Sequence, residues 1–483
     1  MTAFESIAAA ACLACSAAAQ AQPYDTPPPP APPRPLTIAA PTEQALPNGL
    51  RIITSRREGV PLVTAVLVVL SGSEADPPQL SGLASMTADL LTQGTRHYTA
   101  PELAAAAEAL GGSLESGAGW GQSLVTITVL TPKLDAALGL VAEAALEPTF
   151  APEEIDRLRT QTLDGLKVAY ARASTLASLA VARLTYGTSP WGHPASGTPV
   201  SLPRIGRADL VALHRTLFRP DRAVLILTGD IRPDAALALA RRHFGSWKAP
   251  AEASAAAPAV PASAQGPAMV AIDLPGAGQA GVTMALPLPE RQGSDWPVAD
   301  VMNSVLGSGY SSRLNEEIRI KRGLSYGAGS RIDARDRSAL FVASVQTKNE
   351  SVVEVVKLLQ GELDRMAKEP VGADEIAARK AELIGSFSRS VETTAGLASA
   401  LRGLVVTGRS PEGLKTRIPA LEAVSPAEVQ RYAAAHLGAA DRRIAVAGIA
   451  ERFAAGLRAT TPGLAVIPAD ELDFDRSGGL KRE

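Results

Sequence analysis

The sequence predicts an α+β fold built from two tandem units of similar size. Three observations predict it. Strand-like and helix-like segments alternate along the chain, and their order repeats after about 220 residues. A low-complexity Ala/Pro/Ser segment, 250–266, separates the two repeats as a linker. With 483 residues, 46% of them apolar, the chain can bury more than one core.

Composition narrows the class of protein. The net charge is −2 and no basic tract stands out, which argues against nucleic acid as a partner. After the N-terminal segment, no apolar run approaches the length of a membrane-spanning helix, so we expect no integral membrane segment. Both cysteines, Cys12 and Cys15, lie in that N-terminal segment. The remainder therefore has neither disulfides nor thiolate metal ligands.

Residues 1–21 have the pattern of a secretory signal peptide. A short run of small apolar residues ends in an A-x-A cleavage site at Ala19-Gln20-Ala21. The usual basic start is missing, since no Lys or Arg precedes Arg34, and lipid attachment at Cys15 is a weaker alternative. We therefore expect an exported, periplasmic protein. A proline-rich spacer, 22–44, follows and cannot fold by itself.

The first unit, 45–249, alternates strand and helix patterns. The β-branched run Val60–Leu70 predicts a strand buried on both faces. Alternation along Leu124–Leu130 predicts a half-buried strand. Thr99 and Glu102 have the spacing of a capping box at the start of a helix. The predicted helices are 82–91, 101–110, 133–145, 151–170, 207–217 and 233–243, and two further strands are 51–55 and 223–228.

The second unit, 267–470, repeats this order and precedes a tail, 471–483. Apolar residues recur at helical spacing along Ser351–Met366, which predicts an amphipathic helix. Two pairs of segments align between the units: 147–163 with 369–383, and 218–231 with 437–450. The other predicted elements are strands 282–286, 340–345 and 443–448 and helices 295–306, 374–386 and 426–436.

A glycine-rich segment of the second unit leads into a charged amphipathic helix. Ser311 and Ser312 are placed to cap its start, and Gly323 to end it. Arg319 and Tyr326 then lie seven positions apart across the helix end. This spacing could direct a guanidinium and a phenol into one cleft. The alternative is a solvated helix face followed by a half-buried tyrosine.

The order of elements from about residue 45 to 460 resembles that of the pitrilysin/insulinase-type zinc peptidases. Their signature H-x-x-E-H is preceded by G-L-A and followed by G-T. This chain has Gly82-Leu83-Ala84 and Gly94-Thr95 in register, but the signature positions read Ser85-Met86-Thr87-Ala88-Asp89. The resemblance implies two domains, each a mainly antiparallel sheet packed with helices, like half of a clamshell.

The substitutions remove the chemistry of the signature. Ser85 and Asp89 stand where the family has its two histidine ligands, and Ala88 stands where it has the catalytic glutamate. The family's third ligand, a glutamate, falls at Gly165 or Leu166, where Asp164 is the only nearby carboxylate. We therefore expect no metal and no other cofactor bound by this chain.

The second unit instead keeps a family motif. The pattern R-x-K-x-x-L-x-Y matches residue by residue from Arg319 to Tyr326. The resemblance implies that Arg319 binds the substrate backbone and that Tyr326 stabilises the oxyanion of the tetrahedral intermediate. It also implies that Gly309, Ser311 and Ser312, in the glycine-rich lead-in, contact substrate.

The resemblance thus predicts a non-catalytic subunit of a periplasmic zinc metallopeptidase. A homologous zinc-bearing subunit would form a heterodimer with it and use Arg319 and Tyr326 in trans on peptides or unfolded chains. The alternative is a catalytically dead structural or peptide-binding protein of the same fold. Glycine-rich 115–122 is either a peptide-pairing edge strand or a plain hairpin turn.

Overall fold

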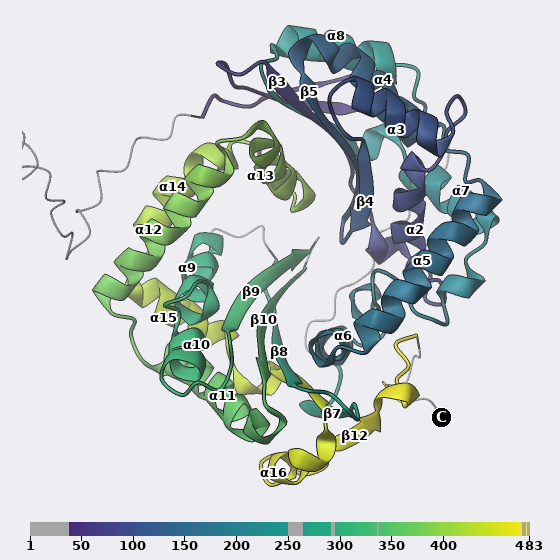
Figure 1. Ribbon diagram of the computed structural model, residues 1–483. Helices are drawn as coiled ribbons and strands as arrows, with labels where there is room; N and C mark the ends of the chain where they lie inside the picture. The colour runs from purple at the N-terminus through teal and green to yellow at the C-terminus, as the bar shows by residue number, and fades with distance from the viewer. Residues whose placement is uncertain (1–37, 250–263, 291–294, 336–337, 476–479, 481–483) are drawn as a thin grey trace, which may run out of the picture. The chain divides into compact units, whose positions relative to one another are not determined.

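Two six-stranded sheets, each packed with helices, make up the chain in the computed structural model (Figure 1). This arrangement confirms the predicted α+β fold class. The signal peptide, most of the spacer and most of the linker lie outside the residues that the structure describes. Those described residues are 38–249, 264–290, 295–335, 338–475 and 480.

The first sheet has the strand order β1-β2-β6-β3-β5-β4. All neighbouring strands are antiparallel except β2 and β6, which are parallel. The predicted double burial of the third strand is confirmed, because seven of its eight residues are buried. The strands are β1 (Thr42–Ala45), β2 (Arg51–Arg56), β3 (Leu62–Val69), β4 (Glu115–Gly119), β5 (Gln122–Leu130) and β6 (Ala223–Gly229).

The second sheet repeats this pattern in the order β12-β7-β11-β8-β10-β9. Its five strands from β7 to β9 have the same sequence order and the same single parallel pair as the five from β2 to β4. Only the outer strand differs, since β12 is parallel to β7. The strands are β7 (Met269–Asp273), β8 (Ala280–Leu288), β9 (Ala328–Arg335), β10 (Ser338–Thr347), β11 (Arg443–Gly448) and β12 (Ala465–Pro468).

Helices cover both sheets. Within the described residues, no helix is both long and apolar enough to cross a membrane. In the first half they are α2 (Leu83–Asp89), α3 (Ala100–Ala109), α4 (Leu134–Leu146), α5 (Pro152–Tyr170), α6 (Ala173–Tyr186), α7 (Arg207–Leu217) and α8 (Pro233–Phe244). In the second half they are α9 (Trp296–Gly307), α10 (Arg313–Asn315), α11 (Val352–Lys368), α12 (Ala373–Ser390), α13 (Thr394–Val406), α14 (Gly413–Ala423), α15 (Pro426–His436) and α16 (Ala454–Arg458).

Two helices that the sequence analysis did not predict are exchanged between the halves. Helix α6 belongs to the first half but packs against β8 and β11 of the second sheet, where Ala177 and Ala180 are fully buried. Helix α13 belongs to the second half but packs against β3 and β6 of the first. There the hydroxyl groups of Thr394 and Thr64 lie 2.8 Å apart, and Thr228 donates to the Thr394 carbonyl.

A buried arginine joins the halves at a second place. The guanidinium of Arg335, at the end of β9, lies over the rings of Trp120 and Tyr186, 4.6 and 4.9 Å from their centroids. It donates to the carbonyl of Trp191 at 2.9 Å and to the carboxylate of Asp333 at 2.8 Å. Because Trp120, Tyr186 and Trp191 all belong to the first half, this one side chain connects β9 to three of its segments.

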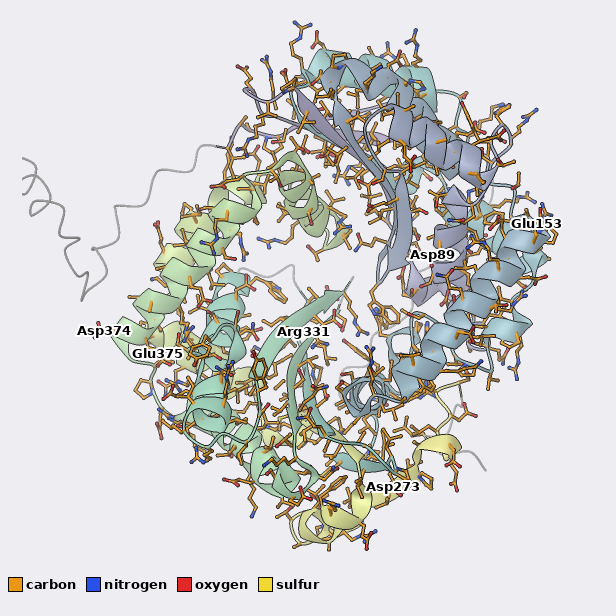
Figure 2. All side chains as sticks on the ribbon, in the orientation of Figure 1. Asp89, Glu153, Asp273, Arg331, Asp374 and Glu375 are labelled. Carbon is orange, nitrogen blue, oxygen red and sulfur yellow. The ribbon has the colours of Figure 1, made fainter. Side chains whose placement is uncertain are left out.

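Replacement of Arg335 should therefore destabilise the protein. We expect Arg335→Ala to lower the free energy of unfolding by about 3 kcal/mol, since it removes a buried cation and leaves its acceptors unpaired. Arg331→Ala is the matched control, because Arg331 lies on the same strand but is exposed (Figure 2). Urea denaturation of both variants checks this. Equal losses would show that Arg335 contributes no more than a surface arginine does.

Candidate functional site

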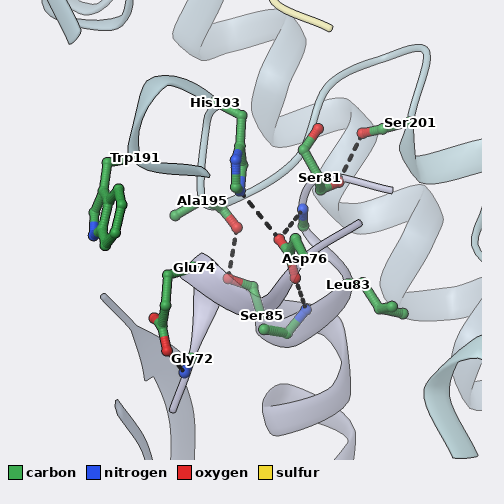
Figure 3. A network of polar contacts seen from close by, with 12 residues as sticks. Gly72, Glu74, Asp76, Ser81, Leu83, Ser85, Trp191, His193, Ala195 and Ser201 are labelled. Carbon is green, nitrogen blue, oxygen red and sulfur yellow. Dashed lines mark hydrogen bonds and ion pairs between the residues drawn. The ribbon is translucent and has the colours of Figure 1, made fainter. Parts of the chain in front are cut away.

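The degenerate metal motif lies on helix α2, which packs against α7 and β4. The helix is shorter than predicted, because it ends at Asp89 and continues as one 3-10 turn. Ser85 donates its hydroxyl to the carbonyl of Ala195 at 2.7 Å (Figure 3). Ala88 is buried. Asp89 is half-buried and lies beside β4 (Figure 2).

These side chains do not fit a zinc ion. Zinc in peptidases takes three protein ligands, drawn from imidazole nitrogens and carboxylate oxygens. Here the Ser85 hydroxyl is bound to a backbone carbonyl, and Asp164, near the expected third ligand, pairs with Lys167 at 2.8 Å. Across the part of the chain that the structure describes, no group of three or more His, Cys, Asp or Glu side chains could hold a metal ion. The side chains of α2 therefore do not support a metal-dependent step of peptide hydrolysis.

A buried acid that the sequence analysis missed fixes the start of α2. Asp76 accepts hydrogen bonds from the backbone N–H groups of Gly82 and Ala84, at 2.8 and 2.7 Å (Figure 3). Its Oδ2 lies 3.3 Å from Nε2 of His193. Burial raises the pKa of Asp76, and the His193 contact and the backbone bonds oppose this shift. The only sequence signal was an acidic loop directly after a buried strand.

A second buried acid organises the same loop. Glu74 accepts from the hydroxyl of Ser71 and the N–H of Gly72, at 2.9 and 2.8 Å. Its other oxygen accepts from the N–H of Gly121 in the β4–β5 turn at 2.6 Å. The carboxylate therefore ties the end of β3 to the turn beside β4. These contacts hold the scaffold of the motif in place without a metal.

The Arg319/Tyr326 segment departs from the predicted capped α-helix. After α10 the chain forms a π-helical turn, Glu316–Ile320, in which the N–H of Lys321 donates to the carbonyl of Glu316. Ser312 is fully buried, and its hydroxyl donates to the Gly309 carbonyl at 2.8 Å instead of capping the helix. Ser312 thus occupies the N-cap position of α10, as predicted, but its side chain makes no capping hydrogen bond. Its hydroxyl donates to the carbonyl of the preceding turn and accepts from no N–H group at the start of the helix.

One ion pair and one hydrogen bond hold this segment against α12. Arg313 makes a bidentate contact with Glu375, at 2.9 and 2.7 Å. Arg379, also on α12, donates to the Ser311 hydroxyl at 3.0 Å. A bidentate pair with a buried arginine fixes orientation as well as distance. The segment is thus attached to a long helix directly before its functional residues.

Arg319 lies between two exposed tyrosines. Its guanidinium carbon is 5.0 Å from the ring centroid of Tyr310 and 4.7 Å from that of Tyr326. Tyr326 is 88% exposed and Tyr310 65% exposed, which is unusual for side chains of this size. The predicted proximity of Arg319 and Tyr326 is therefore present in the structure. Tyr310 was not predicted, because only the fold brings its ring to the guanidinium of Arg319.

Gly309 has a backbone conformation that favours glycine. Its φ of 87° is left-handed, and a Cβ atom there would lie 2.5 Å from Oε1 of Glu382. The left-handed backbone therefore favours glycine here, whereas the Glu382 carboxylate is the end of a flexible side chain and could move aside. Substrate contacts by Gly309, Ser311 and Ser312 remain a prediction.

Two family models match the chain. "Insulinase (Peptidase family M16)" matches residues 51–198, and "Peptidase M16 inactive domain" matches residues 204–383.

Individual proteins agree with these models. An uncharacterized zinc protease of Mycobacterium tuberculosis is 26% identical over 414 residues, 84% of this chain and 94% of the relative. The non-peptidase homolog YmxG of Helicobacter pylori is 25% identical over 379 residues, 78% and 86% of the two chains. The crystal structure of a peptidase M16 inactive domain from Pseudomonas fluorescens superposes with a TM-score of 0.80 at 25% identity, covering 84% of this chain and 98% of that one.

The half-buried Asp89 should make stability depend on pH. Burial raises the pKa of Asp89 to about 6, so the folded state binds a proton more tightly than the unfolded state does. Stability should therefore fall as pH rises from about 4 to 7. Asp89→Asn should abolish this component and raise the free energy of unfolding at pH 7 by on the order of 2 kcal/mol. Urea denaturation of both proteins at about pH 4.5 and about pH 7.5 measures this change, and parallel pH profiles for the two proteins would contradict it.

Proposed function

Since this chain belongs to the M16 family of insulinase-type peptidases, we propose that it is the non-catalytic subunit of a zinc peptidase. A homologous partner chain with an intact H-x-x-E-H motif supplies the metal and the general base. This chain supplies Arg319 and Tyr326 to the partner's site. The substrate is a peptide or an unfolded polypeptide. The proposal places the complex in the periplasm, on the basis of the signal-peptide pattern in residues 1–21.

The observation that carries the proposal is that Tyr326 is exposed and lies beside Arg319. Tyr326 is 88% exposed, and its ring is stacked on Arg319. Arg319 has no ion-pair partner among the residues that the structure describes, so its five N–H donors are available. An exposed phenol and a guanidinium without an ion pair, on a segment that Arg313 ties to α12, fit a role at an interface.

The chemistry of the two groups suits amide hydrolysis. A guanidinium can donate two parallel hydrogen bonds to backbone carbonyls of an extended peptide and so position it. A phenol hydroxyl can donate to the oxygen of the scissile carbonyl, where negative charge develops in the transition state. Zinc bound in the partner would activate the attacking water. The residues at Ser85, Ala88 and Asp89 offer this chain no equivalent of that step.

Peptide binding without catalysis is the second candidate, and one feature favours it. Strand β4 is one of the two edge strands of the first sheet among the described residues, and its sequence is glycine-rich. It borders a groove of about 810 Å³ whose wall includes Gly111, Gly112, Ser113 and Glu115. An extended peptide could add to such an edge through its backbone.

Removal of the phenol hydroxyl separates these two functions. In the complex purified with its zinc-bearing subunit, we expect Tyr326→Phe to lower kcat on a peptide substrate by on the order of 100-fold, as loss of one oxyanion donor does elsewhere. The ring and its contact with Arg319 remain, so complex assembly should not change. Peptide cleavage assays and size-exclusion chromatography measure the two effects.

Tyr310→Phe is the matched control. The ring of Tyr310 lies against the same guanidinium and is also exposed, but the proposal gives its hydroxyl no role. Its turnover should equal that of the wild type. Unchanged turnover in Tyr326→Phe would refute the oxyanion role and favour the peptide-binding candidate.

A further inference from the structure

A cavity of about 380 Å³ lies among helices α12, α13 and α14, all of which belong to the second half. Its apolar wall includes Phe387, Ala400, Leu404 and Leu414. The volume falls within the range of small-molecule sites in proteins. None of the residues assigned above to the peptidase role lines this cavity.

Two arginines, Arg409 and Arg417, line this cavity, and none of its described lining residues carries a carboxylate. Arg417 pairs with Asp300 at 3.0 Å and lies over the ring of Phe387, 5.5 Å from its centroid. Arg409 is half-buried and has no ion-pair partner among the described residues. Glu412, the acidic residue nearest to it in sequence, pairs instead with Lys415 at 3.5 Å.

The charge of Arg409 is therefore poorly compensated. Burial is the first cause that lowers the pKa of Arg409, and the positive charge of Arg417 lowers it further. Asp300 opposes these effects but already contacts Arg417. Two guanidinium groups against one carboxylate leave the cavity with a net positive charge in a partly desolvated place. An anion placed between the two arginines would neutralise the excess positive charge and would replace the water that the partly buried guanidinium has lost.

Small residues on α13 create the space. Gly403 lines the cavity, and a Cβ atom built on it would meet no atom within 4 Å. Glycine in a helix interior costs roughly 1 kcal/mol relative to alanine, and here no close backbone contact requires it. The open volume beside Gly403 thus lies directly against the apolar wall.

We propose that this cavity is a binding site for a small organic carboxylate with an aromatic or aliphatic body. The carboxylate lies at Arg409 and Arg417, and the body packs against Phe387, Leu404 and Leu414. The proposal rests on the cavity, on its two guanidinium groups and on its apolar wall. It is independent of the proposed role of Arg319 and Tyr326.

Phenylacetate and phenylacetamide, which differ in charge but hardly in shape, test the site by isothermal titration calorimetry on the full chain. We expect saturable binding of phenylacetate at millimolar concentration or below, and at least tenfold weaker binding of the amide. Arg409→Gln should weaken phenylacetate binding at least tenfold, as loss of a charge-assisted hydrogen bond does. Gly403→Leu, which fills the open volume without replacing an arginine, should abolish binding.

Arg402→Gln is the matched control. Arg402 lies on α13, next to Gly403, and is half-buried like Arg409, but it lines the groove beside β4 and not this cavity. Its affinity for phenylacetate should equal that of the wild type. Circular dichroism and thermal unfolding establish that each variant is folded. No saturable binding by the wild type, equal affinity for acid and amide, or equal losses in Arg409→Gln and Arg402→Gln would each overturn the proposal.

Discussion

The buried guanidinium of Arg335 needs polar and aromatic partners that several segments, distant in the sequence, supply together. A charge withdrawn from water costs several kcal/mol unless partners replace its hydration. Here the replacement comes from a carboxylate on its own strand, a backbone carbonyl and two aromatic faces. Because the carbonyl and the rings belong to the first half, the β4–β5 turn, the end of α6 and the following turn are all held relative to β9.

The β4–β5 turn, which carries Trp120, is also connected through side-chain contacts to α2, the helix that carries the degenerate motif. The ring of Trp120, stacked on Arg335, makes an edge contact with His193 at 5.3 Å, and His193 lies against Asp76. Asp76 in turn accepts from the first N–H groups of α2. A continuous set of contacts therefore runs from the second sheet to the motif helix. Carboxylates and rings therefore position α2 without a metal ion.

Patterns within single elements were predictable from the sequence. Alternation along β5 and the apolar stripe of α11 each reflect one buried face, so local spacing suffices. Helices α6 and α13 escaped prediction because they are rich in small residues and lack a clear amphipathic pattern. The π-helical turn and the Ser312 bond are local but follow no pattern that the sequence analysis used, whereas the contact of Asp76 with His193 depends on the tertiary fold. The Arg319/Tyr326 pair was visible as a motif, whereas Tyr310 and the arginines of the α12–α14 cavity become neighbours only on folding.

Because α6 and α13 are exchanged, neither half of the chain is expected to fold by itself. Each sheet has one face covered by a helix from the other half, so either half expressed alone would leave Val270, Ala445 or their counterparts in water. Such a fragment could cover that face only by borrowing the helix of a second copy. The two halves of this one chain thus exchange helices as the two subunits of a domain-swapped dimer do. Each half therefore depends on the other for its stability.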